Sequence, residues 1–234
     1  LESKQAQTYK VLSQEFRITS PAGRPVEYMA GLFLYAEDTN FASRLTTLVG
    51  ANRVFPAPAS VCGTPCIAKP GARGFSKFDQ ETRSVALFGS MTWHMTDVWN
   101  VTGGLRWSRD EKEVEIAHTN AAGNGFVFDR LLFKPNPSRK LDRSESKVTW
   151  SVNTRYNVSD DVMLFATAAT GFKSGGFNAL RVPVGQPVEF ANESSITYET
   201  GVKSFFFDRQ VLLNLTLFNT TVDDLQESTL GPSG

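Results

Sequence analysis

The feature that most constrains the fold of this chain is a repeated alternation of apolar and polar residues. The alternation is clearest between Trp99 and Asp110, where every second residue belongs to the same class. One face of this segment is apolar or small and carries Trp99, Val101, Gly103, Leu105 and Trp107. A period of two residues indicates a β-strand, because successive side chains of a strand point to opposite sides. Long strands with one apolar face are therefore predicted.

The alternation predicts about eight strands, which are connected in turn by short turns and long polar loops. The predicted strands span residues 9–19, 26–38, 82–95, 98–117, 145–157, 161–175, 194–207 and 210–223. Short turns are predicted at 20–25, 96–97, 158–160 and 208–209, and long loops at 39–81, 118–144 and 177–193. Outer-membrane β-barrels show this rhythm, with short periplasmic turns and long extracellular loops. The sequence therefore predicts an all-β fold, as an antiparallel transmembrane β-barrel segment.

The composition agrees with membrane strands and argues against several other classes of protein. Lys and Arg number 24 and Asp and Glu number 24, so no basic field would attract nucleic acid. No run approaches the roughly 18 apolar residues of a transmembrane helix, but a barrel strand needs only about 9–11 residues. The sequence contains no hydrolase elbow, P-loop or HExxH motif. We therefore expect neither an enzyme nor a bound cofactor or metal.

The same alternation predicts which side chains face lipid. On three strands these are Val85, Leu87, Gly89, Met91 and Trp93; Val148, Trp150, Val152, Thr154 and Tyr156; and Val211, Leu213, Leu215 and Leu217. Segment 161–175 is ambiguous, and we expect Val162, Leu164, Ala166 and Ala168 to face lipid because Lys173 then faces the lumen. A cation on the lipid face near the midplane costs about 2–4 kcal/mol. Lys147 and Arg155 are therefore predicted to point inward.

Five aromatic residues are predicted to lie at the membrane interface. They are Trp93, Trp99, Trp107, Trp150 and Tyr156. Trp and Tyr are enriched at this level of membrane proteins because one end of the side chain is apolar and the other polar. The alternative is that these residues fill a soluble core, where Trp is also common.

The two cysteines lie close together in the first long loop, in the segment VCGTPC. We expect Cys62 and Cys66 to form a disulfide, since such bonds persist in exported proteins. Free thiols and a metal site are the alternatives. A metal site would need further ligands, and the histidines, His94 and His118, lie in other segments.

Several segments resemble the β-barrel of TonB-dependent outer-membrane receptors. Residues 160–178 read DDVMLFATAATGFKSGGFN, and residues 198–226 read YETGVKSFFFDRQVLLNLTLFNTTVDDLQ. Residues 87–110 are similar as well, so the resemblance covers nearly the whole chain apart from the loops. It implies that residues 1–234 are a partial barrel domain, with about eight strands of a probable 22-stranded wall. We expect a longer protein, because the chain shows no signal peptide, TonB box, plug domain or final aromatic strand.

The resemblance also implies a function. Such receptors import a scarce nutrient, most often a ferric siderophore or another iron chelate. The expected partners are outer-membrane lipid, the small-molecule ligand, and the TonB–ExbB–ExbD complex, which acts through the missing plug and TonB box. The alternatives are a passive porin-like or small structural outer-membrane barrel, and a soluble all-β carbohydrate-binding module.

Ligand-binding residues are expected in the long loops, where binding residues concentrate. The candidates are Phe172, Lys173, Phe177, Asn178 and Arg181 around the third long loop, and Arg139, Lys140 and Arg143 in the second. Their cations would attract an anionic chelate, although each could equally be an ordinary exposed loop charge. The acidic residues Asp110, Glu111, Glu113 and Glu115 are interpreted as a solvated rim rather than a cation site.

Overall fold

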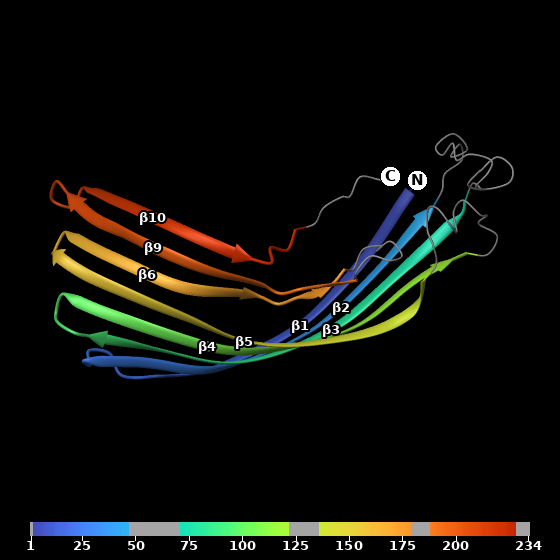
Figure 1. Cartoon of the computed structure of the whole chain (residues 1–234), viewed down its shortest axis with the longest axis horizontal. Helices are drawn as coiled ribbons and strands as arrows, with labels where there is room; N and C mark the ends of the chain where they lie inside the picture. The colour runs from blue at the N-terminus through green and yellow to red at the C-terminus, as the bar shows by residue number, and fades with distance from the viewer. Residues whose placement is uncertain (1, 47–70, 122–135, 179–187, 228–234) are drawn as a thin grey trace.

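The computed structural model describes residues 2–46, 71–121, 136–178 and 188–227, and its main element is one curved antiparallel sheet (Figure 1). In spatial order, its eight strands are β1 (Glu2–Thr19), β2 (Val26–Thr46), β3 (Arg73–His94), β4 (Trp99–Asn120), β5 (Asn136–Ser159), β6 (Val162–Lys173), β9 (Glu193–Phe206) and β10 (Val211–Asp223). Between β6 and β9 lies a small hairpin of β7 (Gly176–Phe177) and β8 (Glu189–Phe190). The predicted all-β, antiparallel architecture is confirmed.

Each strand of the large sheet pairs with its nearest neighbour in the chain, apart from the inserted hairpin. β1 and β10 are the two edges, so the sheet is an open trough and not a closed barrel. Within the described residues the other sheet is only the two-stranded β7–β8 hairpin, so this part of the chain is not a sandwich of two large packed sheets. The described residues contain no helix of a length and hydropathy suited to crossing a membrane.

All four short connections lie at one end of the trough, on the left in Figure 1. They join β1 to β2, β3 to β4, β5 to β6 and β9 to β10, as predicted to within two residues. The long connections leave from the other end. There the sequence prediction is wrong in detail, because the strands run farther than expected: β2 continues to Thr46, β3 begins at Arg73 and β5 begins at Asn136.

The strand register aligns the apolar residues of neighbouring strands in rows on the convex face. Leu87 lies opposite Trp107, which lies opposite Val148. Side chains on this face are open to the surroundings, as the 55% exposure of Leu87 shows, whereas Ala86 on the concave face is 1% exposed. The predicted outward sets of β3, β5 and β10 share this convex face. The ambiguous β6 joins them through Leu164, opposite Tyr156.

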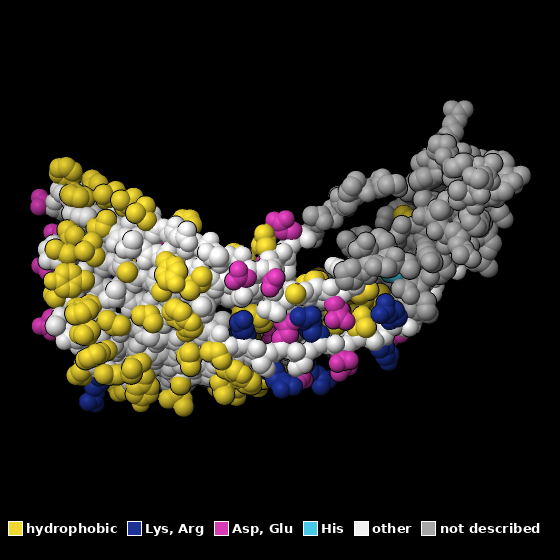
Figure 2. Space-filling view, in the orientation of Figure 1, with side chains coloured by type: hydrophobic (Ala, Val, Ile, Leu, Met, Phe, Trp, Pro, Cys, Tyr) yellow, Lys and Arg dark blue, Asp and Glu magenta, His cyan; other side chains and the backbone are white. Residues whose placement is uncertain are grey.

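The convex face is divided across the strands into two regions (Figure 2). Near the short turns it is apolar, and on β3 this region runs from Trp93 to Val85. We call it the apolar belt. Beyond it the same face becomes charged, with Lys77, Asp79, Glu81 and Arg83 on β3 and Arg109, Glu111, Glu113 and Glu115 on β4. We call this second region the charged extension.

Polar atoms within the belt are bonded to the sheet itself. The Thr154 hydroxyl accepts a hydrogen bond from the Trp99 indole N–H (2.8 Å) and lies 3.4 Å from the Asn100 carbonyl. The Thr200 hydroxyl donates to the Phe165 carbonyl at 3.1 Å. Since an unpaired hydroxyl in hydrocarbon costs free energy, these bonds allow threonine to stand on an apolar surface.

Candidate functional site

A hydrophobic cluster on the concave face, at the same level along the strands as the charged extension, holds the β7–β8 hairpin against the wall. Phe177 of β7 is 5% exposed and packs with residues from β2, β3 and β4, namely Phe41, Phe78, Val114 and Ile116. Leu141 and Val188 pack at its border. The loop between β6 and β9 therefore folds back across strands that are far away in the sequence.

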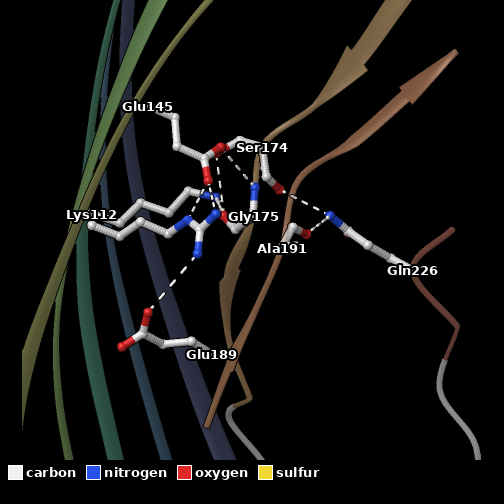
Figure 3. Close-up of polar contacts among 8 residues, drawn as sticks. Lys112, Glu145, Ser174, Gly175, Glu189, Ala191 and Gln226 are labelled. Atoms are coloured by element: carbon white, nitrogen blue, oxygen red, sulfur yellow. Dashed lines mark hydrogen bonds and ion pairs between the residues drawn. The ribbon is translucent and has the colours of Figure 1, made fainter. Parts of the chain in front are cut away.

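Polar side chains of the wall bind the backbone of Gly175, next to β7 (Figure 3). The Lys112 ammonium donates to the Gly175 carbonyl at 2.6 Å. The Gly175 N–H donates to Glu145 Oε2 at 3.1 Å. Both wall residues come from the concave face, Lys112 from β4 and Glu145 from β5. One peptide unit is thus held at its donor and at its acceptor by two neighbouring strands.

Arg143 connects this contact to the other strand of the hairpin. Its guanidinium pairs with Glu145 and lies 3.9 Å from the Glu189 carboxylate of β8. A β-carbon at Gly175 would lie 2.7 Å from Arg143 Cζ and 2.6 Å from the Phe190 carbonyl. Only glycine therefore permits this close approach. We call Lys112, Arg143 and Glu145 the hairpin clamp.

Gln226, just after β10, contacts the same loop from the side opposite the hairpin clamp (Figure 3). Its side-chain amide donates to the Ala191 carbonyl at 2.8 Å and lies 3.4 Å from the Ser174 carbonyl. Its backbone N–H donates to Glu193 Oε2 at 3.0 Å. The two ends of the β6–β9 connection are therefore joined through a single residue.

Burial of the clamp affects its charges. Lys112 lies beyond the apolar belt, and burial lowers the pKa of its ammonium below the usual range. The carboxylates of Asp110 and Glu145 act in the opposite direction and favour the charged form. A half-buried ammonium next to these carboxylates and a carbonyl is a strong donor, so the contact with Gly175 fixes the turn.

The structure separates the predicted ligand-binding residues into those that hold the hairpin and those that remain accessible. Phe177 and Arg143 belong to the cluster and the clamp. Lys173 and Asn178, which flank the β7 segment, are exposed, and Asn178 donates its backbone N–H to the Val188 carbonyl.

The remaining candidates are more dispersed. Arg139 is exposed and lies opposite Ile116 on the concave face, whereas Lys140 lies opposite Glu115 on the convex face. The Phe172 ring has the Lys147 ammonium 5.9 Å from its centroid. Arg181, together with Cys62 and Cys66 and their expected disulfide, lies outside the described residues.

The five aromatic candidates all lie on the convex face, within the belt. Trp99 lies opposite Tyr156, and these two residues and Trp93 are near the short turns. Trp107 and Trp150 lie farther along the belt, opposite Val148 and Leu105. All five side chains are substantially exposed, between 36% for Trp107 and 51% for Trp93. A role in a soluble core does not fit this placement.

Of the three clamp residues, the sequence analysis identified Arg143 as a candidate and missed Lys112 and Glu145. The predicted acidic rim is divided between the two faces: the register places Asp110, with its neighbour Lys112, on the concave face and Glu111, Glu113 and Glu115 on the convex face. The signal was available in the alternation, because Lys112 shares its parity with the apolar Val114. Among the described residues, no cluster of three or more metal-ligating side chains occurs.

Comparison with known proteins shows to which family this sheet belongs. The family described as TonB dependent receptor-like, beta-barrel matches residues 6–234. The chain therefore belongs to the TonB-dependent receptors and is a segment of their outer-membrane β-barrel. Members of this family are receptors and transporters.

Individual relatives are similar over part of their length. The pesticin receptor of Yersinia pestis is 26% identical over 143 residues, which are 61% of this chain and 19% of that protein. The vitamin B12 transporter BtuB of Photobacterium profundum is 25% identical over 150 residues, which are 62% of this chain and 23% of that protein. The chain thus spans about a fifth of these relatives.

Solved structures share the fold. The ferric yersiniabactin uptake receptor FyuA from Yersinia pestis superposes with a TM-score of 0.73 and 21% identity, over 96% of this chain and 30% of that chain. The closed form of the ferric-catecholate import receptor Fiu from E. coli gives 0.63 and 17%, over 98% and 33%. The chain therefore covers about a third of each of these two receptor chains.

The belt has the dimensions that an outer-membrane location requires. Val85 to Trp93 spans about 26 Å along the strand at about 3.3 Å per residue. A strand tilt of about 40° reduces this to about 20 Å, close to the roughly 25 Å apolar band of outer-membrane barrels. The convex face of the belt therefore meets lipid, and the concave face is the lumenal wall.

Proposed function

We propose that the full polypeptide imports an anionic iron chelate, most specifically a ferric siderophore, and that residues 1–234 form a partial barrel domain of that importer. The observation that carries the proposal is the hairpin folded onto the lumenal wall beyond the belt. Because hydrogen bonds and apolar contacts fix this hairpin to the wall, the long-loop end of the barrel has an ordered surface on which a ligand can bind. The siderophore receptors named above share the fold of the wall and support the ligand class.

The accessible side chains beside this hairpin are suited to an anionic ligand. Lys173 and Asn178 flank β7, and Arg139 extends from the same concave face. An iron chelate with net negative charge would be attracted by the two cations and accept hydrogen bonds from all three. Arg143 and Phe177 act indirectly, because they hold the hairpin to the wall. Arg181 remains a sequence prediction.

Transport in this proposal depends on energy from the inner membrane. The TonB–ExbB–ExbD complex would act on a plug and a TonB box elsewhere in the polypeptide, while this wall stays rigid in the lipid. A passive porin-like barrel is the second candidate, and it would conduct small solutes without TonB.

The test uses the full-length protein in cells that lack their own siderophore receptors. We expect uptake of iron-55 supplied as ferric yersiniabactin or as a ferric catecholate, and we expect that deletion of TonB abolishes it. Radiolabelled cobalamin serves as a ligand without an iron chelate. Uptake of cobalamin alone would contradict the iron assignment, and TonB-independent entry of both ligands would favour the porin.

Two charge reversals then test the binding surface. Lys173→Glu should weaken chelate binding by about tenfold or more, since it replaces an attractive charge next to the ligand with a repulsive one. Lys140→Glu is the matched control, because Lys140 lies on the convex face. Equal effects of the two substitutions on binding would contradict the placement of the ligand on the concave side.

A further inference from the structure

His94, at the end of β3 near the short turns, has one bonded and one unbonded ring nitrogen. Its Nδ1 lies 2.7 Å from the side-chain oxygen of Asn100, directly opposite on β4. Because that oxygen only accepts hydrogen bonds, the proton of the neutral ring is on Nδ1, and Nε2 carries a lone pair. Nε2 is buried and has no hydrogen-bond partner among the described residues. A buried polar atom without a partner is uncommon and often marks a bound ion or water.

The carboxylate of Glu27, on β2, lies next to this nitrogen. Glu27 Oε1 is 3.5 Å from His94 Nε2, and the same oxygen accepts the Gly23 N–H of the β1–β2 turn at 2.7 Å. Two acceptors therefore lie next to each other. A charge-assisted N–H···O bond measures about 2.7–2.9 Å, so a shared proton would bring the two atoms closer. This holds for either orientation of the Asn100 amide, since 3.5 Å is long for any N–H donated by Nε2.

The separation fits two ligands of one metal ion. Zinc lies about 2.0–2.1 Å from a histidine nitrogen and about 2.0–2.2 Å from a carboxylate oxygen, so at the tetrahedral angle the two ligand atoms are about 3.4 Å apart. The neighbouring contacts also fit. A histidine that binds metal donates its other N–H to an oxygen, and a carboxylate that binds metal is itself hydrogen-bonded. Asn100 and the Gly23 N–H supply these two contacts.

The pair lines a groove of about 620 Å³ at the short-turn end of the sheet. The charged residues of its lining are Arg24 and Arg155, and Glu27 and Asp97. Two cations and two carboxylates balance each other, so the lining has no excess positive charge that would repel a metal ion. Asp97 and Met95, from the β3–β4 turn, carry further ligand atoms, and water can fill the positions that they leave.

We propose that His94 and Glu27 bind one divalent transition-metal ion of the zinc type, and that Asn100 is the positioning residue of the imidazole. An imidazole nitrogen favours zinc, copper or nickel over magnesium and calcium. The ion joins β2 to β3 beside the β1–β2 turn, so it fixes this rim of the wall. The site is remote from the hairpin clamp and does not depend on the siderophore assignment.

Calorimetric titration of the metal-free, full-length receptor with zinc chloride tests the proposal. The wild type should bind one zinc ion more than His94→Gln. Asn100→Ala should weaken this binding about 10–100-fold, the usual cost of losing an outer-shell partner, and Asn100→Asp, which keeps an acceptor oxygen, should restore it. His118→Gln is the matched control, because His118 lies at the other end of β4 and contacts Ser76. Equal zinc stoichiometry in the wild type and His94→Gln would overturn the proposal.

Urea titration then distinguishes a metal ion from a proton. Zinc at neutral pH should raise the urea midpoint of the wild type, because it binds only the folded receptor, and should not raise that of His94→Gln. Glu27→Gln is the second variant, used if His94→Gln does not assemble, and it should also lose the effect of zinc. A midpoint that rises only on acidification in the presence of a chelator, and not with zinc, would assign the contact to a proton and contradict the metal site.

Discussion

The apolar belt and the charged extension are built from the same strands, and the pairing of β4 with β5 keeps one register from Trp99 to Ile116, but the convex side chains of the two regions differ. In the belt, Leu87, Trp107 and Val148 lie side by side on the convex face. Farther along the same strands, the corresponding row is Glu81, Glu113 and Asp142. The pairing of the strands is therefore the same whether the convex face contacts lipid or water. The surroundings therefore determine which side chains the convex face carries, whereas backbone hydrogen bonding determines how the strands pair.

The largest expected effect comes from placing a charge in the belt. Leu105→Arg puts a guanidinium on the convex face near the midplane and should lower the free energy of unfolding by about 2–4 kcal/mol. Glu113→Arg, on the convex face of the extension, should be neutral or slightly stabilising, because it removes like charges that lie directly opposite each other. Urea titration of the full-length protein in liposomes measures both. Equal losses for the two variants would contradict the division into two regions.

A smaller effect is expected inside the lumen, at Gly31 of β2. A β-carbon there would lie 2.8 Å from the Phe16 carbonyl and would also meet the Phe88 ring, so Gly31→Ala should cost about 1–3 kcal/mol. Gly103→Ala is the matched control, since no atom lies within 4 Å of the position of its β-carbon. The same urea titration applies. A larger cost at Gly103 than at Gly31 would contradict the assignment of faces.

The hairpin clamp distinguishes the concave side of the extension from its convex side. Lys112→Met removes the donor to the Gly175 carbonyl and should raise the hydrogen-exchange rate of the Asn178 amide about tenfold, the factor for a charged hydrogen bond of about 1.5 kcal/mol. Lys77→Met, which breaks an ion pair with Asp79 on the convex face, should leave that rate unchanged. An Asn178 amide that is equally protected in both variants would show that the clamp does not hold the hairpin.

The strands were easier to predict from the sequence in the apolar belt than in the charged extension. Strand 98–117 was predictable because its two faces differ in polarity from Trp99 to Asp110. The start of β3, residues 73–81, was predicted as loop because Lys77, Asp79 and Glu81 are charged on one face while Ser76 and Gln80 are polar on the other. Alternation identifies a strand only where its two faces meet different solvents.

The candidate site was predictable in part for a related reason. The sequence predicts Lys173, Phe177 and Asn178 as ligand-binding candidates of one long loop, but it gives no sign that Phe177 is buried. It is buried because the loop folds back onto Phe41 and Phe78, and such long-range contacts leave no local signal in the sequence. The role of Gln226, which joins two segments more than thirty residues away, could not be predicted for the same reason.

The smallest effect is expected for the threonine hydroxyls of the belt. Thr200→Val keeps the shape of the side chain and removes its bond to the Phe165 carbonyl, so a loss of about 0.5–1.5 kcal/mol is expected. Thr102→Val, on the concave face, also breaks one hydroxyl bond, to Thr92, but does so next to the lumen. Urea titration should give the larger loss for Thr200→Val if its surroundings contain no water. The reverse order would contradict a lipid environment at β9.

The most direct test of the account is a nitroxide scan of β4, one residue at a time from Trp99 to Glu115, in the full-length receptor without its native cysteines. In bilayers, accessibility to oxygen should alternate with a period of two from Trp99 to Trp107, with maxima on the convex residues. From Arg109 onward, the same convex positions should become accessible to a water-soluble nickel chelate instead. Absence of the alternation, or oxygen-accessible convex positions as far as Glu115, would contradict a wall whose strands cross the membrane at the belt and leave it at the extension.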